Sequence, residues 1–163
     1  LPSRTLDSAV KYAWNRGAVV ACAAGNSNSS QKTYPAAYAN CIAVGATDEN
    51  DAKASFSSFG PNWVDVAAPG ERILSTLPPC EVPTWLTLVY GYGCLYDSLR
   101  GTSMATPHVA GLAALVWARY GLGNTAAFVR SKVETTADSP GAGVYWKWGR
   151  VNYCKAVEGS CSP

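Results

Sequence analysis

One eleven-residue segment holds the side chains best suited to chemistry in this sequence. It reads Gly101-Thr-Ser-Met-Ala-Thr-Pro-His-Val-Ala-Gly111 and contains Ser103 and His108. Gly101 and the following threonine form a turn into an apolar helix, which places the Ser103 hydroxyl in the first helical turn. Unpaired amides and the positive helix end favour a developing oxyanion there, as an acyl-transfer nucleophile requires. Local physics alone favours a plain capping residue without chemistry.

His108 is unsuited to act as a base for Ser103. The two residues are five positions apart, which at about 100° per residue places them roughly 140° apart around the helix. We therefore expect His108 to be a buried, structural histidine. Because it is the only histidine of the sequence, the chain supplies no histidine base for Ser103.

The segment resembles the serine motif of the subtilisin-like serine proteases, the subtilase family, and most of all its thermitase and proteinase K branches. Other blocks match the family in order: Val19–Asn26, Tyr34–Tyr38, Ile42–Ala46, Phe56–Gly60, Asp65–Gly70, Ile73–Thr76 and Gly149–Asn152. The resemblance extends over essentially the whole chain except residues 78–100.

The resemblance implies a catalytic site built on two residues. Ser103 would be the nucleophile, and Asn26 would donate its side-chain amide to the oxyanion beside the Ser103 backbone amide. The predicted substrate-binding residues are Ala23, Ala24 and Gly25, along one wall of the primary specificity pocket, and Thr33 near its base. No cofactor is expected for catalysis.

A structural cation site is also implied by the resemblance, together with a cis peptide bond before Pro35. The ligands would be the backbone carbonyls of Ala36, Tyr38 and Cys41 and the side chain of Asp65. Oxygen-only ligands suit Ca²⁺ or Na⁺. A loop carboxylate that caps backbone amides is an equally open interpretation of Asp65.

The chain departs from the family in lacking two members of the triad. In subtilisins the triad runs Asp, His, Ser along the chain, and the first two would fall upstream of Leu1. We therefore expect the C-terminal part of a serine endopeptidase domain that cleaves polypeptides. It should be inactive without its partner, the N-terminal part of the same domain.

Two other functions are compatible with parts of the sequence. One is a non-catalytic pseudoenzyme or binding module on the same scaffold, against which the retained Ser103 and Asn26 argue. The other is a hydrolase with Ser–Lys chemistry. It is disfavoured because residues 101–105 are not a G-x-S-x-G elbow and no lysine lies near Ser103 in sequence.

Composition and charge limit the classes of protein to which the sequence can belong. The 163 residues are 48% hydrophobic and 15% charged, which indicates one folded domain with a core rather than disorder. The formal net charge is +2 and no basic run occurs, so neither nucleic acid nor membrane is an expected partner. The longest apolar run, residues 109–118, falls short of the roughly 20 residues that span a bilayer.

The six cysteines point to an exported protein. No CxxC pair occurs, which disfavours zinc. The even count favours three disulfides over buried cytosolic thiols, so a secreted protein is expected. The predicted pairs are Cys80–Cys94 and Cys154–Cys161, each of which closes a loop, and Cys22–Cys41 on two strands expected to be parallel neighbours.

Helical and strand patterns alternate, which predicts an α/β fold with a mainly parallel sheet. The expected helices cover residues 5–16, 102–120 and 124–137, the strands 18–24, 41–46, 64–68 and 73–77, with a hairpin over 86–96 and a final short element over 151–157. The helix over 102–120 is apolar almost all round and is predicted to be buried.

Residues 1–163 are thus expected to form the C-terminal part of a single domain, with 78–100 as a disulfide-pinned surface insertion. The resemblance implies the three-layer subtilisin-like fold, incomplete here because its N-terminal strands are absent. Strand 18–24 would then be an unpaired, apolar edge.

Overall fold

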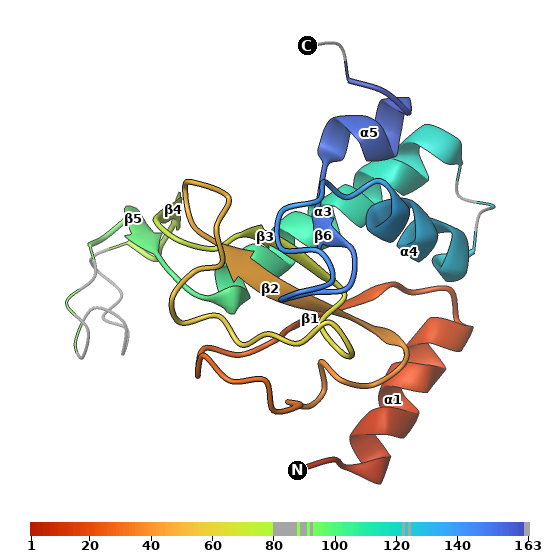
Figure 1. Ribbon diagram of the computed structural model, residues 1–163, viewed down its shortest axis with the longest axis horizontal. Coiled ribbons are helices and arrows are strands. Elements are labelled where there is room, and N and C mark those ends of the chain that lie inside the picture. Colours follow the sequence, from red (N-terminus) through yellow and green to blue (C-terminus); the bar gives the residue numbers. More distant parts are fainter. Residues whose placement is uncertain (80–87, 89–90, 92, 122, 124, 162–163) are drawn as a thin grey trace.

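The computed structural model describes residues 1–79, 88, 91, 93–121, 123 and 125–161. Its elements are α1 (Arg4–Asn15), β1 (Val20–Ala23), β2 (Cys41–Thr47), β3 (Val66–Pro69), β4 (Ile73–Thr76), β5 (Tyr96–Leu99), α3 (Thr102–Tyr120), α4 (Ala126–Thr135), β6 (Gly149–Arg150) and α5 (Tyr153–Glu158). A parallel sheet has the order β1-β2-β3-β6, and β4 pairs with β5 as an antiparallel ribbon. Figure 1 shows α1 on one side of the sheet and α3, α4 and α5 on the other. The predicted α/β class and layered fold are confirmed.

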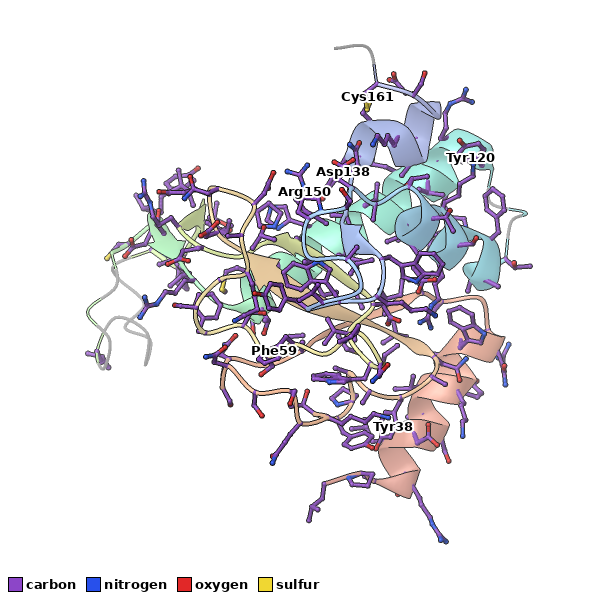
Figure 2. All side chains as sticks on the ribbon, viewed as in Figure 1. Tyr38, Phe59, Tyr120, Asp138, Arg150 and Cys161 are labelled. Atoms are coloured by element: carbon purple, nitrogen blue, oxygen red, sulfur yellow. A yellow bond between two sulfur atoms is a disulfide. The ribbon has the colours of Figure 1, made fainter. Side chains whose placement is uncertain are left out.

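Strand β2 is buried along its whole length because both of its faces are covered. Successive side chains of a strand point to opposite faces. Ile42 and Val44 belong to the core that includes residues of α3, α4 and α5, whereas Cys41 and Ala43 belong to the core on the α1 side. In Figure 2, Tyr38 accordingly lies near α1, and the partly buried Tyr120, the last residue of α3, lies beside α4. A continuous apolar run is typical of such a central parallel strand.

Local signals account for the helix ends. Ser3 accepts a hydrogen bond from the Leu6 amide at the start of α1, and Thr125 does the same for Phe128 at the start of α4. These bonds satisfy amides that the first turn leaves unpaired. The predicted cap of α4, Asn124, lies outside the described residues. The predicted bounds of α3 are confirmed to the residue.

The prediction that α3 is buried all round is wrong for one face. Val109, Leu112 and Val116 are fully buried against the sheet, but the opposite side of the helix is exposed. We call this side the outer face of α3; its residues are Pro107, Ala110, Gly111, Ala114, Leu115 and Ala118.

Strand β1 forms one edge of the four-stranded sheet, as expected.

Two strands of the described structure, β5 and β6, were not predicted from the sequence. β6 has only two residues, which is too short for a periodic pattern, and β5 takes up residues 96–99 opposite β4. The hairpin expected over residues 86–96 falls largely outside the described residues.

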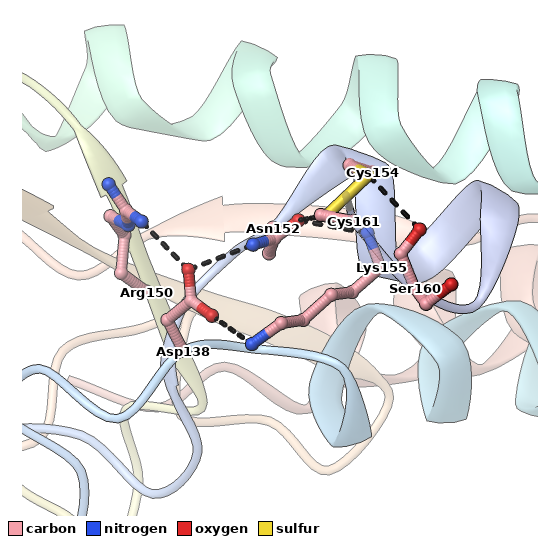
Figure 3. The surroundings of a disulfide bond; sticks show 7 residues. All are labelled: Asp138, Arg150, Asn152, Cys154, Lys155, Ser160 and Cys161. Atoms are coloured by element: carbon pink, nitrogen blue, oxygen red, sulfur yellow. Dashed lines mark hydrogen bonds and ion pairs between the residues drawn. A yellow bond between two sulfur atoms is a disulfide. The ribbon is translucent and has the colours of Figure 1, made fainter. Parts of the chain in front are cut away.

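The cysteines follow the prediction in part. Cys154, in the first turn of α5, and Cys161, just after that helix, form the expected disulfide (Figure 3). Cys94 is disulfide-bonded, and its predicted partner, Cys80, lies outside the described residues.

The third predicted bridge is wrong, because Cys22 and Cys41 are buried free thiols. The strand register pairs Cys22 with Ala43 and Cys41 with Val20, so the two cysteines are diagonal neighbours. Neighbouring strands lie about 4.8 Å apart and rise about 3.3 Å per residue, so an offset of two residues gives a Cα separation of roughly 8 Å, beyond the usual Cα separation of a disulfide. The thiols form a hydrogen bond instead, which lowers the pKa of Cys22 and, with burial, raises that of Cys41.

Among the described residues, no helix is both long enough and apolar enough to cross a membrane.

Candidate active site

The turn before α3 presents Ser103 to solvent. Gly101 has a φ of +149° and anchors the turn through its amide, which donates to the Gly70 carbonyl at 2.8 Å. As the N-cap residue, Gly101 has no side chain with which to occupy the first-turn amides. Ser103 follows as the second residue of α3, and its side chain is exposed. The site thus combines a free hydroxyl with the positive end of a helix of 19 residues.

Asn26 is joined to this turn through Thr102. The Thr102 amide and hydroxyl both donate to Asn26 Oδ1, each at 2.9 Å. The Gly25 amide donates in turn to Thr102 Oγ1 at 3.1 Å. Because its oxygen is occupied in this way, Asn26 directs Nδ2 to the other side, where a β-carbon on Gly101 would lie 3.2 Å away. The structure therefore brings Asn26 and the Ser103 turn together across 76 residues of sequence.

Thr102 is the site residue that sequence reasoning missed, since only its place in the turn was recognised. It is fully buried and uses its hydroxyl both as donor and as acceptor. A threonine directly before the serine at a helix start was the available signal, but its partners lie on another element.

The predicted pocket residues lie around the end of β1. Ala24 is fully buried, and its carbonyl accepts a hydrogen bond from Thr33 Oγ1 at 2.8 Å. This bond turns the Thr33 methyl group toward Gly25, where a β-carbon would lie 3.5 Å from it. None of these residues carries a charge, and their role as a wall of the specificity pocket stays a prediction. The peptide bond before Pro35 is cis, as predicted.

His108 is half-buried rather than buried, which corrects the prediction. Its Nδ1 lies 2.9 Å from the Met104 carbonyl, so this nitrogen carries the proton. This hydrogen bond holds the imidazole ring against the preceding turn of α3.

An open cavity of about 460 Å³ lies beside Ser103, at the N-terminal end of the outer face of α3. It is lined by Ile73, Leu74, Ser75, Thr76, Leu99, Ser103, Met104, Pro107, His108 and Tyr153. Most of these side chains are apolar or neutral, so the cavity suits an apolar group more than a charged one.

The predicted cation ligands line a smaller cavity of about 130 Å³, which they share with Arg130. Asp65 Oδ2 accepts from the Ala43 amide at 2.8 Å, and its Oδ1 pairs with Arg130 at 3.1 Å. Arg130 also donates to the Ala39 carbonyl at 2.7 Å. Burial raises the pKa of Asp65, while Arg130 and the Ala43 amide act in the opposite direction. No group of three or more His, Cys, Asp or Glu side chains in the described parts of the chain could hold a metal.

A parallel sheet flanked by helices, with a serine in the first turn of α3 and an asparagine shortly after β1, is the arrangement expected of the subtilisin-like class. Residues 2–150 match the model of the Subtilase family, and the chain belongs to that family.

The similar proteins agree with this assignment. Thermitase of Thermoactinomyces vulgaris is 49% identical over 154 residues, which cover 94% of this chain and 49% of that protein. Subtilisin BL of Lederbergia lenta is 44% identical over 151 residues, covering 93% and 50% respectively. A solved protease from Pseudoalteromonas arctica superposes with a TM-score of 0.82 at 29% identity, covering 98% of this chain and 48% of that one. The chain spans about half the length of the curated relatives it matches.

Proposed function

We propose that this chain is the serine-bearing part of a subtilisin-type serine endopeptidase that cleaves polypeptides through an acyl-enzyme on Ser103. The observation that carries the proposal is the pair of hydrogen bonds from Thr102 to Asn26 Oδ1. These bonds leave the Asn26 amide group as a donor beside the turn that carries Ser103. A donor held in place before the reaction starts is what stabilises a developing oxyanion most effectively.

The reaction needs a base that this chain does not supply. Ser103 keeps its proton at neutral pH and is a poor nucleophile by itself. In the proposed mechanism, a histidine on the N-terminal part of the domain takes this proton as Ser103 attacks the peptide carbonyl. The Asn26 amide and the Ser103 backbone amide bind the oxyanion. The histidine then protonates the leaving amine, and water hydrolyses the ester.

The N-terminal part would dock on the outer face of α3 and on the neighbouring cavity. A helix that is apolar all round is ordinarily covered on all sides, yet Leu115 is 47% exposed and its neighbours on this face are small. Small residues let a second backbone approach closely. Coverage of this face would bring partner side chains next to Ser103, because the cavity at its end is lined by Ser103 and Met104.

Two further properties are part of the proposal. The Cys154–Cys161 disulfide supports an extracellular location, since such bonds persist in oxidising compartments. The carbonyls of Ala36, Tyr38 and Cys41, with Asp65, suit a weakly bound Na⁺ better than Ca²⁺. Arg130 already neutralises the one carboxylate among these ligands.

The test is active-site labelling with a fluorophosphonate probe. The chain alone should not react, whereas the chain supplied with the N-terminal part of a subtilase domain should label and cleave peptides. Ser103→Ala is the control and should abolish labelling. Rapid labelling of Ser103 in the isolated chain would refute the proposed chemistry. A completed domain that binds peptide but never acylates would favour the pseudoenzyme.

A further inference from the structure

The segment Phe56-Ser57-Ser58-Phe59-Gly60, which we call the serine segment, lies alongside the loop that carries Asn26. Three backbone hydrogen bonds join them. The Asn28 amide donates to the Phe56 carbonyl at 2.8 Å, the Ser58 amide to the Gly25 carbonyl at 2.8 Å, and the Phe59 amide to the Ser29 carbonyl at 3.0 Å. The loop from Gly25 to Ser29 is therefore attached to the serine segment on both sides of Asn26.

Ser58 contacts both residues that flank Asn26. The Ser27 amide donates to Ser58 Oγ at 3.4 Å. On the other side, a β-carbon on Gly25 would lie 3.4 Å from the same oxygen. Ser58 is fully buried, so its hydroxyl acts on the loop and not on a bound substrate.

Thr102 and Ser58 hold different parts of Asn26. Thr102 orients the side chain through Oδ1. The backbone that carries this side chain is held through Gly25 and Ser27. Both restraints are needed, because displacement of a catalytic group by about 1 Å can cost on the order of 10²-fold in rate.

We propose that Ser58 is a positioning residue for the oxyanion site: its buried hydroxyl fixes the backbone of Asn26 at the place from which the amide meets the developing charge. The inference rests on the proposed function, because it assigns Ser58 a role through Asn26. The 3.4 Å bond is longer than the usual 2.9–3.0 Å of an amide bond to oxygen, so it is a modest restraint with a modest effect.

Ser57 provides a matched control. It is also a fully buried serine of the same segment, but its hydroxyl accepts from the Ala46 amide at 2.9 Å and donates to the Ser58 carbonyl at 3.0 Å. Ser57 is thus bonded to the core side of the segment. Ser57→Ala and Ser58→Ala each remove one buried hydroxyl. Ser57→Ala should cost more stability, because it removes two short hydrogen bonds where Ser58→Ala removes one long bond.

The first experiment is steady-state kinetics of the completed protease domain on a chromogenic peptide. Ser58→Ala should lower kcat about tenfold with KM within about twofold, because the lost restraint matters only once charge develops. Ser57→Ala should leave kcat within about twofold. In an Asn26→Ala background, Ser58→Ala should have almost no further effect on kcat. Ser58→Cys, which retains a weak acceptor of similar size, should recover part of the rate.

Equal kcat losses in the two serine variants would overturn the proposal. So would a change mainly in KM, or a full Ser58→Ala effect in the absence of the Asn26 amide.

The second experiment needs no catalysis, and its first measurement needs no variant. Amide hydrogen exchange of the chain itself should show the Ser27 amide protected, and Ser58→Ala should speed its exchange about tenfold relative to Ser57→Ala. An unprotected Ser27 amide in the unmodified chain would overturn the inference. A completed domain that never acylates would instead refute the proposed function and leave the exchange result to decide the role of Ser58.

Discussion

Asp138 ties α5 to the last strand of the sheet, and replacing it tests this attachment. Its Oδ2 accepts from Arg150 at 2.8 Å and from Asn152 at 2.9 Å, and its Oδ1 accepts from Lys155 at 2.6 Å (Figure 3). Three donors to one carboxylate stabilise its ionised form. Lys155 is the main cause of the lowered pKa of Asp138, which falls from 3.8 to about 2, with Asn152 and Arg150 also contributing.

The change proposed is Asp138→Asn, which keeps the shape and removes the charge. A pKa lowered from 3.8 to about 2 corresponds to roughly 2 kcal/mol in favour of the folded state. The Lys155 side chain is 46% exposed, so solvent screening reduces the expected loss to about 1–1.5 kcal/mol near neutral pH.

The pH dependence has a definite sign. Because the folded-state pKa is depressed, the stabilisation is fully present above about pH 4 and is lost as the pH falls toward about 2. Urea unfolding of the two chains, with disulfides intact, should therefore give a free-energy difference that is constant from about pH 7 to pH 5 and shrinks below pH 4. A difference that stays the same down to about pH 2.5 would show that the charge of Asp138 is not the cause.

Three further predictions concern the site, the core and the thiols. Asn26→Ala in the completed domain should lower kcat about 10²–10³-fold with little change in KM; unchanged turnover would mean that the oxyanion is bound elsewhere. Gly70→Ala should destabilise the chain by about 2–4 kcal/mol in urea unfolding, because its β-carbon would lie 2.6 Å from that of Ala46; a loss below about 0.5 kcal/mol would contradict this packing. Cys22 and Cys41 should react with iodoacetamide in denaturant without reductant, and mass spectrometry that finds both unmodified would contradict the free-thiol assignment.

Elements with a strong local signal were predictable from the sequence. The bounds of α3 follow from a largely apolar helical pattern between Gly101 and Gly121, and β2 follows from the continuous apolar run over residues 41–46. The end of β1 and the turn before α3 were recognisable from their resemblance to family motifs. Each of these signals lies within one short stretch of chain.

Features that depend on contacts between distant segments were not predictable. The two hydrogen bonds from Thr102 to Asn26 require the end of β1 and the start of α3 to approach each other, and no local pattern encodes that approach. The strand register decides that Cys22 and Cys41 are diagonal rather than opposed, and composition carries no information about register. β6 acquires its place through its ladder with β3 and its bridge to Asp138, both of which join segments far apart in the sequence or outside any periodic pattern.

The outer face of α3 links the assembly of the proposed site to thermodynamic stability. Any polypeptide that covers this face removes apolar surface from water at about 25 cal/mol per Å². It binds the folded chain and not the unfolded one, so by mass action it raises the unfolding temperature, and the increase grows with the logarithm of its concentration relative to its Kd. Melting temperature should therefore keep rising with the logarithm of partner concentration after Ser103 reactivity has levelled off, and the same Kd should describe both curves. A melting experiment on Ser103→Ala would then measure partner affinity without any turnover.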